Sequence, residues 1–228
     1  MITLKTFTKK RGIQMSKVDM SNMVVEVKWH EDMWQEIKDN AMFTIHKFNG
    51  GKYPDSQWKS DLLMSEHSPI RSGRLIINCY NVPTFVINHL VRHNQGFTPF
   101  VSSLRDDRAV YEHDIVPDRN TPNGVRFDGN FQSFINITRR RECTSASKET
   151  RAFWDAVLRE VKKFEPELYS RCVRECIYRG GCPEYPKSCG WWEGFCKKHS
   201  DCNLLDIHER YDVYNNDREK AEARKATK

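Results

Sequence analysis

Two arginines, a histidine, an asparagine and two adjacent serines lie within the fourteen residues from Arg92 to Arg105. Arginine offers forked N–H donors that match a phosphate, and serine offers a short hydroxyl that adapts to it. This stretch therefore has the composition of a site for a phosphorylated ligand. The alternative is a solvated polar loop, which composition alone favours.

The cysteines form a second group of side chains that could carry chemistry. Six of the eight lie between Cys172 and Cys202. In a reducing compartment such clustering favours a metal site or buried thiols over disulfides. The spacing does not match paired Cys-x2-Cys knuckles, so zinc is only a possibility, with His199 as a candidate further ligand. The identity of any metal stays open.

Composition bounds the classes of protein that the chain can belong to. It has 228 residues, of which 38% are hydrophobic and 30% charged, and a net charge of +6. We expect one domain of moderate size, with or without a small appendage. The modest positive charge suits an anionic ligand and makes nucleic acid an improbable partner. An intracellular, cytoplasmic protein is expected, because the sequence shows neither an apolar run long enough to cross a membrane nor a signal peptide.

Hydrophobic periodicity predicts the elements that must position these side chains. Strands are expected at 24–29 and 74–80, and helices at 31–45, 58–64 and 83–93. The best helical pattern begins near Ser147, and Pro166 marks its end or a break. We expect 111–129 to be irregular and 217–228 to be a solvated helix or disordered. The stretch from Arg92 thus begins at a helix C-terminus and continues as a loop.

Four segments resemble motifs of the flavin-dependent thymidylate synthases, in the same order and with nearly the same spacing. Arg92-His93-Asn94, followed after seven residues by Ser102, resembles their Arg-His-Arg-x7-Ser signature. Glu66–Arg71 resembles a His-Glu-Thr-Pro-Phe-Glu segment and is one residue shorter. Asn130–Ser133 resembles Asn-Leu-Arg-Ser. Arg141–Arg151 resembles Arg-x4-Ala-Gln-Trp-Glu-Ile-Arg. The resemblance covers about residues 65–151.

The resemblance implies both a fold and a reaction. The fold is α+β, with mixed helices and an antiparallel sheet, in a homotetramer whose active sites lie between chains. In the reaction, reduced FAD passes a methylene group from methylenetetrahydrofolate to C5 of dUMP, and a flavin hydride completes the methyl group. NADPH re-reduces the flavin. Because the flavin carries this chemistry, the protein needs no nucleophile of its own.

The resemblance also assigns roles residue by residue. Ser103 and Arg105 match the residues that hold the nucleotide phosphate, and Ser102 takes that place in an ungapped alignment. Arg141 matches the arginine at the pyrimidine, where a cation stabilises developing negative charge; with His93 it is the candidate catalytic residue. The residues that match flavin-binding positions are His67, Ser68, Arg92, His93, Asn94 and Asn130.

Several positions depart from the family pattern. Asn94 and Gln132 each replace an arginine, and Arg71 replaces a glutamate. Phe100 or Val101 stands where the family has a polar nucleotide contact, and Ser147-Lys148 replaces Gln-Trp. We expect Arg71 and Arg139-Arg140 to balance part of the lost charge. The departures leave open whether the nucleotide is dUMP or dCMP, and whether a methyl or a hydroxymethyl group is transferred.

We expect four regions along the chain: a basic arm at 1–20, a flavin- and nucleotide-binding catalytic domain at 21–170, a Cys-rich segment at 171–205 and a charged tail at 206–228. A second interpretation is a non-enzymatic protein on this fold, whose Cys-rich segment binds nucleic acid or a protein partner. A third is an active enzyme with a structural metal site.

Overall fold

The computed structural model describes residues 20–48, 50–105, 107, 116–184, 186–199, 202 and 204–226, with the side chains of the last two helical residues excepted. The expected basic arm therefore lies outside the described residues, apart from Met20. No helix in the described ranges is both long and apolar enough to cross a membrane.

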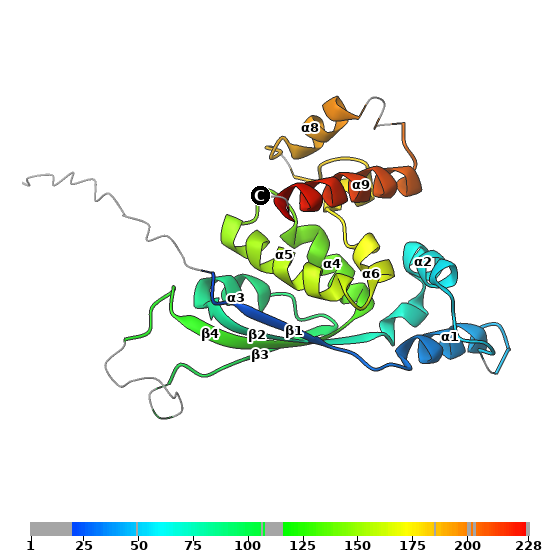
Figure 1. Ribbon diagram of the computed structural model, residues 1–228, viewed down its shortest axis with the longest axis horizontal. Coiled ribbons are helices and arrows are strands. Elements are labelled where there is room, and N and C mark those ends of the chain that lie inside the picture. The colour runs from blue at the N-terminus through cyan, green and yellow to red at the C-terminus, as the bar shows by residue number, and fades with distance from the viewer. Residues whose placement is uncertain are drawn as a thin grey trace, which may run out of the picture.

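A four-stranded antiparallel sheet forms the base of the molecule (Figure 1). Its strands are β1 (Val24–Lys28), β2 (Arg74–Pro83), β3 (Phe97–Val101) and β4 (Pro122–Asn130), in the order β1-β2-β4-β3. β2 and β4 pair along most of their length, with one irregularity between Cys79 and Val82. The α+β class with an antiparallel sheet, predicted from the resemblance, is confirmed.

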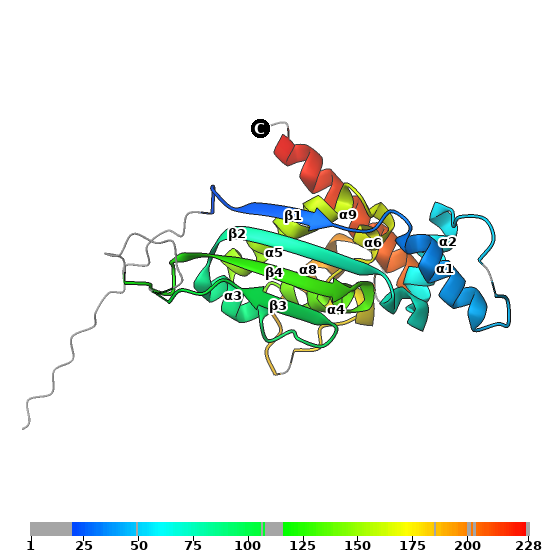
Figure 2. The same cartoon turned by 90° about the horizontal axis from the view of Figure 1, so that it is seen from below.

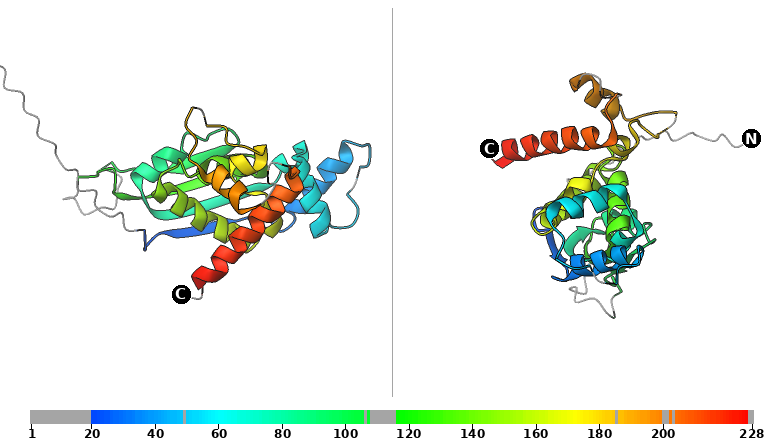
Figure 3. Two further views of the ribbon diagram at one scale, coloured as in Figure 1. Left: turned by 90° about the horizontal axis from the view of Figure 1, so that it is seen from above. Right: turned by 90° about the vertical axis from the view of Figure 1, so that its right-hand side faces the viewer.

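The helices lie mostly on one side of this sheet, where α3, α4 and α5 cover one face (Figures 1 and 2). α8 and α9 form a further layer above α4 and α5, and α1 and α2 lie beyond one end of the sheet (Figures 1 and 3). In chain order the helices are α1 (Met33–Phe43), α2 (Ser56–Ser65), the 3-10 helix η1 (Ser68–Arg71), α3 (Thr84–Leu90), α4 (Phe131–Arg141), α5 (Lys148–Lys162), α6 (Pro166–Arg171), α7 (Glu175–Arg179), α8 (Trp191–Lys198) and α9 (Ile207–Ala226).

The main core lies between the sheet and α3–α5. Alternate residues of β2 and β4, such as Ile77 and Phe127, are fully buried on the helical side. Aromatic rings extend this core from the sheet into the helices. The ring centroids are 5.0 Å apart for Phe97 and Phe127 of the sheet and 5.4 Å apart for Phe134 of α4 and Trp154 of α5. No helix of the described chain covers the opposite face of the sheet (Figure 1). Large side chains such as Phe100 are exposed on that face.

A second hydrophobic cluster holds α7, α8 and α9 together. Val173, Trp192 and Phe195 pack there against Tyr211 and Tyr214 of α9. Of the stretch 217–228, expected to be a solvated helix or disordered, the described residues 217–226 form the second half of α9. The first half of α9 is anchored by the buried rings of Tyr211 and Tyr214.

The expectation of irregular structure at 111–129 is wrong from Pro122 onward, where β4 begins; 111–115 lie outside the described residues. The loop expected after Arg92 is likewise interrupted by β3. Gly129 shows why sequence pattern hid β4. A side chain at Gly129 would collide with the Phe97 ring on the neighbouring strand, so the glycine makes room for a core side chain and does not break the strand.

Candidate functional site

A cavity of about 590 Å³ runs along one side of α4 and contains most of the residues expected to face a cofactor. Gln132, Asn136 and Arg140 line it at intervals of four residues, which places them in one stripe about 12 Å long on the helix surface. The loop after α3 and the end of η1 complete the wall. The lining residues are Arg71, Arg92, His93, Asn94, Gln95, Gly96, Asn130, Gln132, Ser133, Asn136, Ile137 and Arg140.

Hydrogen bonds hold the loop against the first turn of α4. The backbone N–H of Asn130 donates to the Gly96 carbonyl at 3.0 Å, and the Ser133 hydroxyl donates to the Gln95 carbonyl at 2.8 Å. The Asn130 side chain caps the helix by accepting from the Ser133 N–H at 2.9 Å. Gly96 has φ +67°, and a Cβ there would lie 2.7 Å from the Asn130 amide nitrogen. Only glycine suits this position.

The charge of the cavity is one-sided. Three guanidinium groups line it, those of Arg71, Arg92 and Arg140, and no carboxylate is among the lining residues. Within the described part of the chain, neither Arg71 nor Arg92 forms an ion pair. Arg140 forms long ion pairs, 3.9 Å each, with Glu175 and Glu184, neither of which lines this cavity, so the uncompensated charge lies mainly on Arg71 and Arg92. Such an unbalanced set of cations favours an anionic ligand.

His93 faces this group of cations as a neutral imidazole. Burial, together with the charges of Arg141 and Arg140, lowers the pKa of His93 to about 4. Its buried Nε2 has no hydrogen-bond partner among the described residues. Burial and the neighbouring Arg140 and Arg92 likewise lower the pKa of Arg141. An anion in this region would relieve the repulsion, and a polar ligand would supply the partner that His93 lacks.

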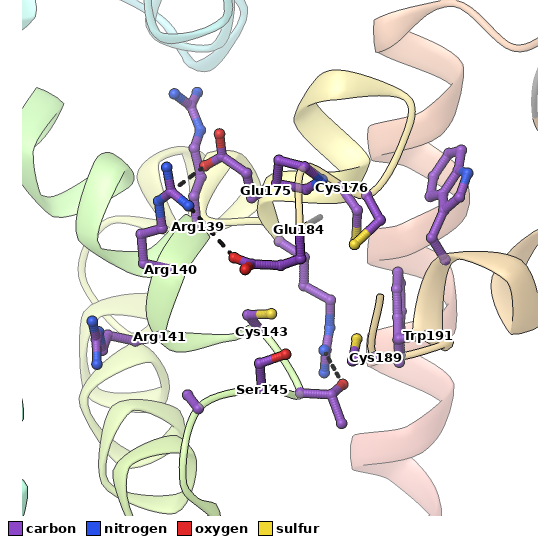
Figure 4. A pocket seen from close by; sticks show the side chains of 16 residues that line it. Arg139, Arg140, Arg141, Cys143, Ser145, Glu175, Cys176, Glu184, Cys189 and Trp191 are labelled. Atoms are coloured by element: carbon purple, nitrogen blue, oxygen red, sulfur yellow. Dashed lines mark hydrogen bonds and ion pairs between the residues drawn. The ribbon is translucent and has the colours of Figure 1, made fainter. Parts of the chain in front are cut away.

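A second, smaller cavity of about 220 Å³ lies on the other side of the α4 C-terminus (Figure 4). Arg140 lines both cavities, whereas Arg141 lines only this one. On its far wall Arg174 lies 4.4 Å from the centroid of the Trp191 ring and donates to the Thr144 hydroxyl at 2.9 Å. The cavity is also lined by Cys143, Cys176, Cys182 and Cys189.

These cysteines do not form the zinc site considered from the sequence. Among the described residues, no three Cys, His, Asp or Glu side chains could hold a metal ion. Burial raises the pKa of Cys176 to about 12, so this group is an uncharged thiol where no cation is bound to it. His199 contacts Asp217 at 2.7 Å, and Cys196 is disulfide-bonded to Cys202.

The structure separates the residues expected at the site into distinct places. Arg92, His93, Asn94 and Asn130 meet at the large cavity. Ser102, Ser103 and Arg105 lie beyond the other end of β3, and all three are exposed. Five extended residues make β3 about 17 Å long, and this strand separates them from Gly96. Arg105 is paired there with Asp107 at 2.7 Å. His67 and Ser68, at the start of η1, are exposed and do not line the cavity.

One expected source of charge is excluded by the structure. Arg139 does not serve the cavity, because it is buried, ion-paired with Glu66 and stacked 3.6 Å from the centroid of the Tyr178 ring. Sequence reasoning also missed Gln95, Ser133 and Asn136 as lining residues. The spacing of Asn136 four residues after Gln132 was the only signal that could have found one of them.

Comparisons with known proteins bear on this site. No family model matches the sequence. Over 66 residues the chain is 39% identical to the flavin-dependent thymidylate synthase of Clostridium tetani (strain Massachusetts / E88), covering 29% of this chain and 26% of that protein. The chain thus matches about a quarter of the length of this curated relative. The match confirms the resemblance drawn from the four motifs.

Two solved structures are similar in fold. Both are of the flavin-dependent thymidylate synthase ThyX from Helicobacter pylori with FAD and dUMP. Each has a TM-score of 0.49 and 12% sequence identity, and the superposition covers 65% of this chain. It covers 100% of one neighbouring chain and 99% of the other.

Proposed function

We propose that the protein is a flavin-dependent enzyme of the thymidylate synthase type. It transfers a one-carbon unit from methylenetetrahydrofolate to C5 of a pyrimidine deoxynucleotide, dUMP in the first instance, with NADPH as reductant. The observation that carries the proposal is the meeting of Arg92, His93, Asn94 and Asn130 at a cavity with three guanidinium groups and no lining carboxylate.

The residues of this cavity fit FAD. The diphosphate of FAD is anionic and suits the unbalanced arginines, and the partnerless Nε2 of His93 suits a polar edge of the flavin ring. When bound, the flavin supplies the carrier for the one-carbon unit and the hydride. The amides of Asn94 and Asn130 would orient it. His93, being neutral, serves as a hydrogen-bonding group and adds no further positive charge.

Arg141 is the residue that we propose for activating the pyrimidine. Its lowered pKa reflects a partly desolvated guanidinium, whose positive charge acts strongly on a nearby substrate. Negative charge that develops on the ring as C5 becomes nucleophilic would be stabilised by this group.

The phosphate of the nucleotide would be held by Ser102, Ser103 and Arg105. Because these residues lie at the other end of β3 from the cavity, we infer that they complete the site of a neighbouring subunit. A homotetramer, as the family resemblance implies, would provide such shared sites. The uncovered face of the sheet, with Val24, Tyr80 and Phe100 exposed, is a surface on which subunits could pack.

The test is incubation of the purified protein with FAD, NADPH, methylenetetrahydrofolate and either dUMP or dCMP, followed by mass analysis of the nucleotide. We expect dUMP to gain a methyl group, and Arg141→Ala to abolish that gain while the protein still takes up flavin. A gain of hydroxymethyl would redirect the proposal to the related hydroxymethylase reaction. Protein that takes up no flavin would refute the proposed function.

A further inference from the structure

We propose that Arg71 supplies the positive charge that Asn94 and Gln132 lack, and that it binds the phosphate part of the flavin dinucleotide. The inference rests on the proposed function. It concerns a position where the chain reverses the charge of the family that it resembles, and it makes Arg71 a determinant of which flavin form is bound.

The net charge summed over positions 71, 94 and 132 is the same in this chain as in the family pattern, but the charges stand at different positions. In the family pattern, positions 94 and 132 are arginines and position 71 is a glutamate, which together carry one net positive charge. In this chain the same positions are Asn94, Gln132 and Arg71, which also carry one net positive charge. All three side chains line the same cavity. A charge lost at two of its walls is therefore regained at a third.

The backbone around Arg71 is held firmly while its side chain is free to meet a ligand. Ile70 is fully buried, and the Phe131 N–H donates to the Gly73 carbonyl at 3.1 Å, which ties this segment to the start of α4. The Ser72 hydroxyl donates to the Pro69 carbonyl at 2.7 Å and accepts from the Asn40 amide at 3.0 Å. Arg71 itself is exposed and forms no ion pair within the described ranges. A cation on a rigid base is suited to phosphate binding.

Glu66 is the carboxylate nearest to Arg71 in the sequence, and it already binds other residues. Glu66 accepts a hydrogen bond from the Gln132 amide at 2.6 Å and pairs with the buried Arg139. Arg139 is neutralised by this pair. Arg140 reaches toward Glu175 and Glu184 at the smaller cavity (Figure 4). Of Arg71, Arg139 and Arg140, the three arginines expected to replace the missing charge, only Arg71 has no carboxylate partner among the described residues.

The test compares the binding of FAD with that of riboflavin, which has the same ring system and no phosphate, by the change in flavin fluorescence on titration. We expect Arg71→Ala to weaken FAD binding on the order of 10- to 100-fold, as loss of a charge-assisted hydrogen bond would, and to leave riboflavin binding within about twofold. Arg71→Glu should weaken FAD binding further. Arg159→Ala is the control, because exposed Arg159 lies on α5 outside this cavity.

A rescue experiment tests whether Arg71→Ala weakens FAD binding because the cavity loses a positive charge or because the substitution disturbs the structure. Adding Asn94→Arg to Arg71→Ala should restore most of the FAD affinity, because it returns a cation to the same cavity. A double variant that binds FAD no better than Arg71→Ala would overturn the inference, as would equal weakening of FAD and riboflavin. These outcomes leave the proposed function intact, whereas a wild-type protein that binds neither flavin refutes the proposed function itself.

Discussion

Burial of the His93 imidazole, reinforced by the guanidinium of Arg141, lowers the pKa of His93 to about 4. The two residues belong to separate motifs, one after α3 and one at the end of α4, and folding brings them close enough to interact. His93 is therefore uncharged at neutral pH, and the positive charge of this region belongs to arginine alone. This division favours an anion beside the arginines and a neutral hydrogen-bonding partner beside the imidazole.

The first prediction concerns stability in acid. The ordinary pKa of histidine is 6.5, and the folded value is about 4. Between these values the unfolded chain takes up a proton that folded His93 does not, so the free energy of unfolding should fall as pH is lowered through this window. His93→Gln should remove part of that fall in urea denaturation at pH 7 and 4.5. An NMR titration with a His93 midpoint near 6.5 would contradict the prediction.

Glu142 should act in the opposite sense. Burial, and the negative charge of Asp155, raise its pKa to about 7 against the opposing effect of nearby arginines such as Arg174. From about pH 4.5 to 7 the unfolded carboxyl loses its proton before the folded one, so this residue should reduce stability as pH rises. We expect Glu142→Gln to gain stability relative to the wild type between pH 5 and pH 8. Parallel stability curves for the two proteins would rule this out.

A third prediction tests the contact between the Gly96 loop and α4. Gly96→Ala should cost about 1–3 kcal/mol, because it imposes a left-handed backbone on alanine and pushes a methyl group into Asn130 and Ser133. It should also weaken flavin binding, since Arg92 and His93 belong to the same loop. Gly181→Ala is the matched control, because a Cβ there meets nothing within 4 Å, and it should change stability by no more than about 0.5 kcal/mol. Equal effects of the two substitutions would show that the loop is not constrained as described.

The fourth prediction concerns the pair formed by Glu66 and Arg139. The Arg139 side chain is only 6% exposed, so Glu66→Ala should cost about 3 kcal/mol by leaving a buried cation without its carboxylate partner. It should also free the Gln132 amide that Glu66 holds. The comparison is Asp128→Ala, which breaks an ion pair to the 58%-exposed Arg74 and should cost less than about 1 kcal/mol. Chemical denaturation measures both, and a loss no larger for Glu66→Ala than for Asp128→Ala would contradict the argument.

Local signals in the sequence predicted much of this protein. The apolar stripe of α5 was predicted from residues within a few turns of one another, as was the start of the helix near Ser147. In the structure Ser147 caps this helix by accepting from the Thr150 N–H. The order of the motifs predicted that Arg92, His93, Asn94 and Asn130 belong to one kind of site. These signals could be read because helix capping, side-chain periodicity and motif spacing are properties of residues near one another in the chain.

Only the tertiary structure decided which charges serve the cavity. Arg139 and Arg71 both stood as candidates to replace the arginines missing at positions 94 and 132. Glu66, which lies 73 residues from Arg139 in sequence, neutralises Arg139, while Arg71 reaches the cavity unpaired. The strand β4 was also missed because its sequence signal depends on a distant residue. Gly129 is needed there to leave room for the ring of Phe97 on the neighbouring strand, and nothing near Gly129 in the sequence shows this. Desolvation and neutralisation of a charge depend on what packs against it, and sequence spacing does not contain that information.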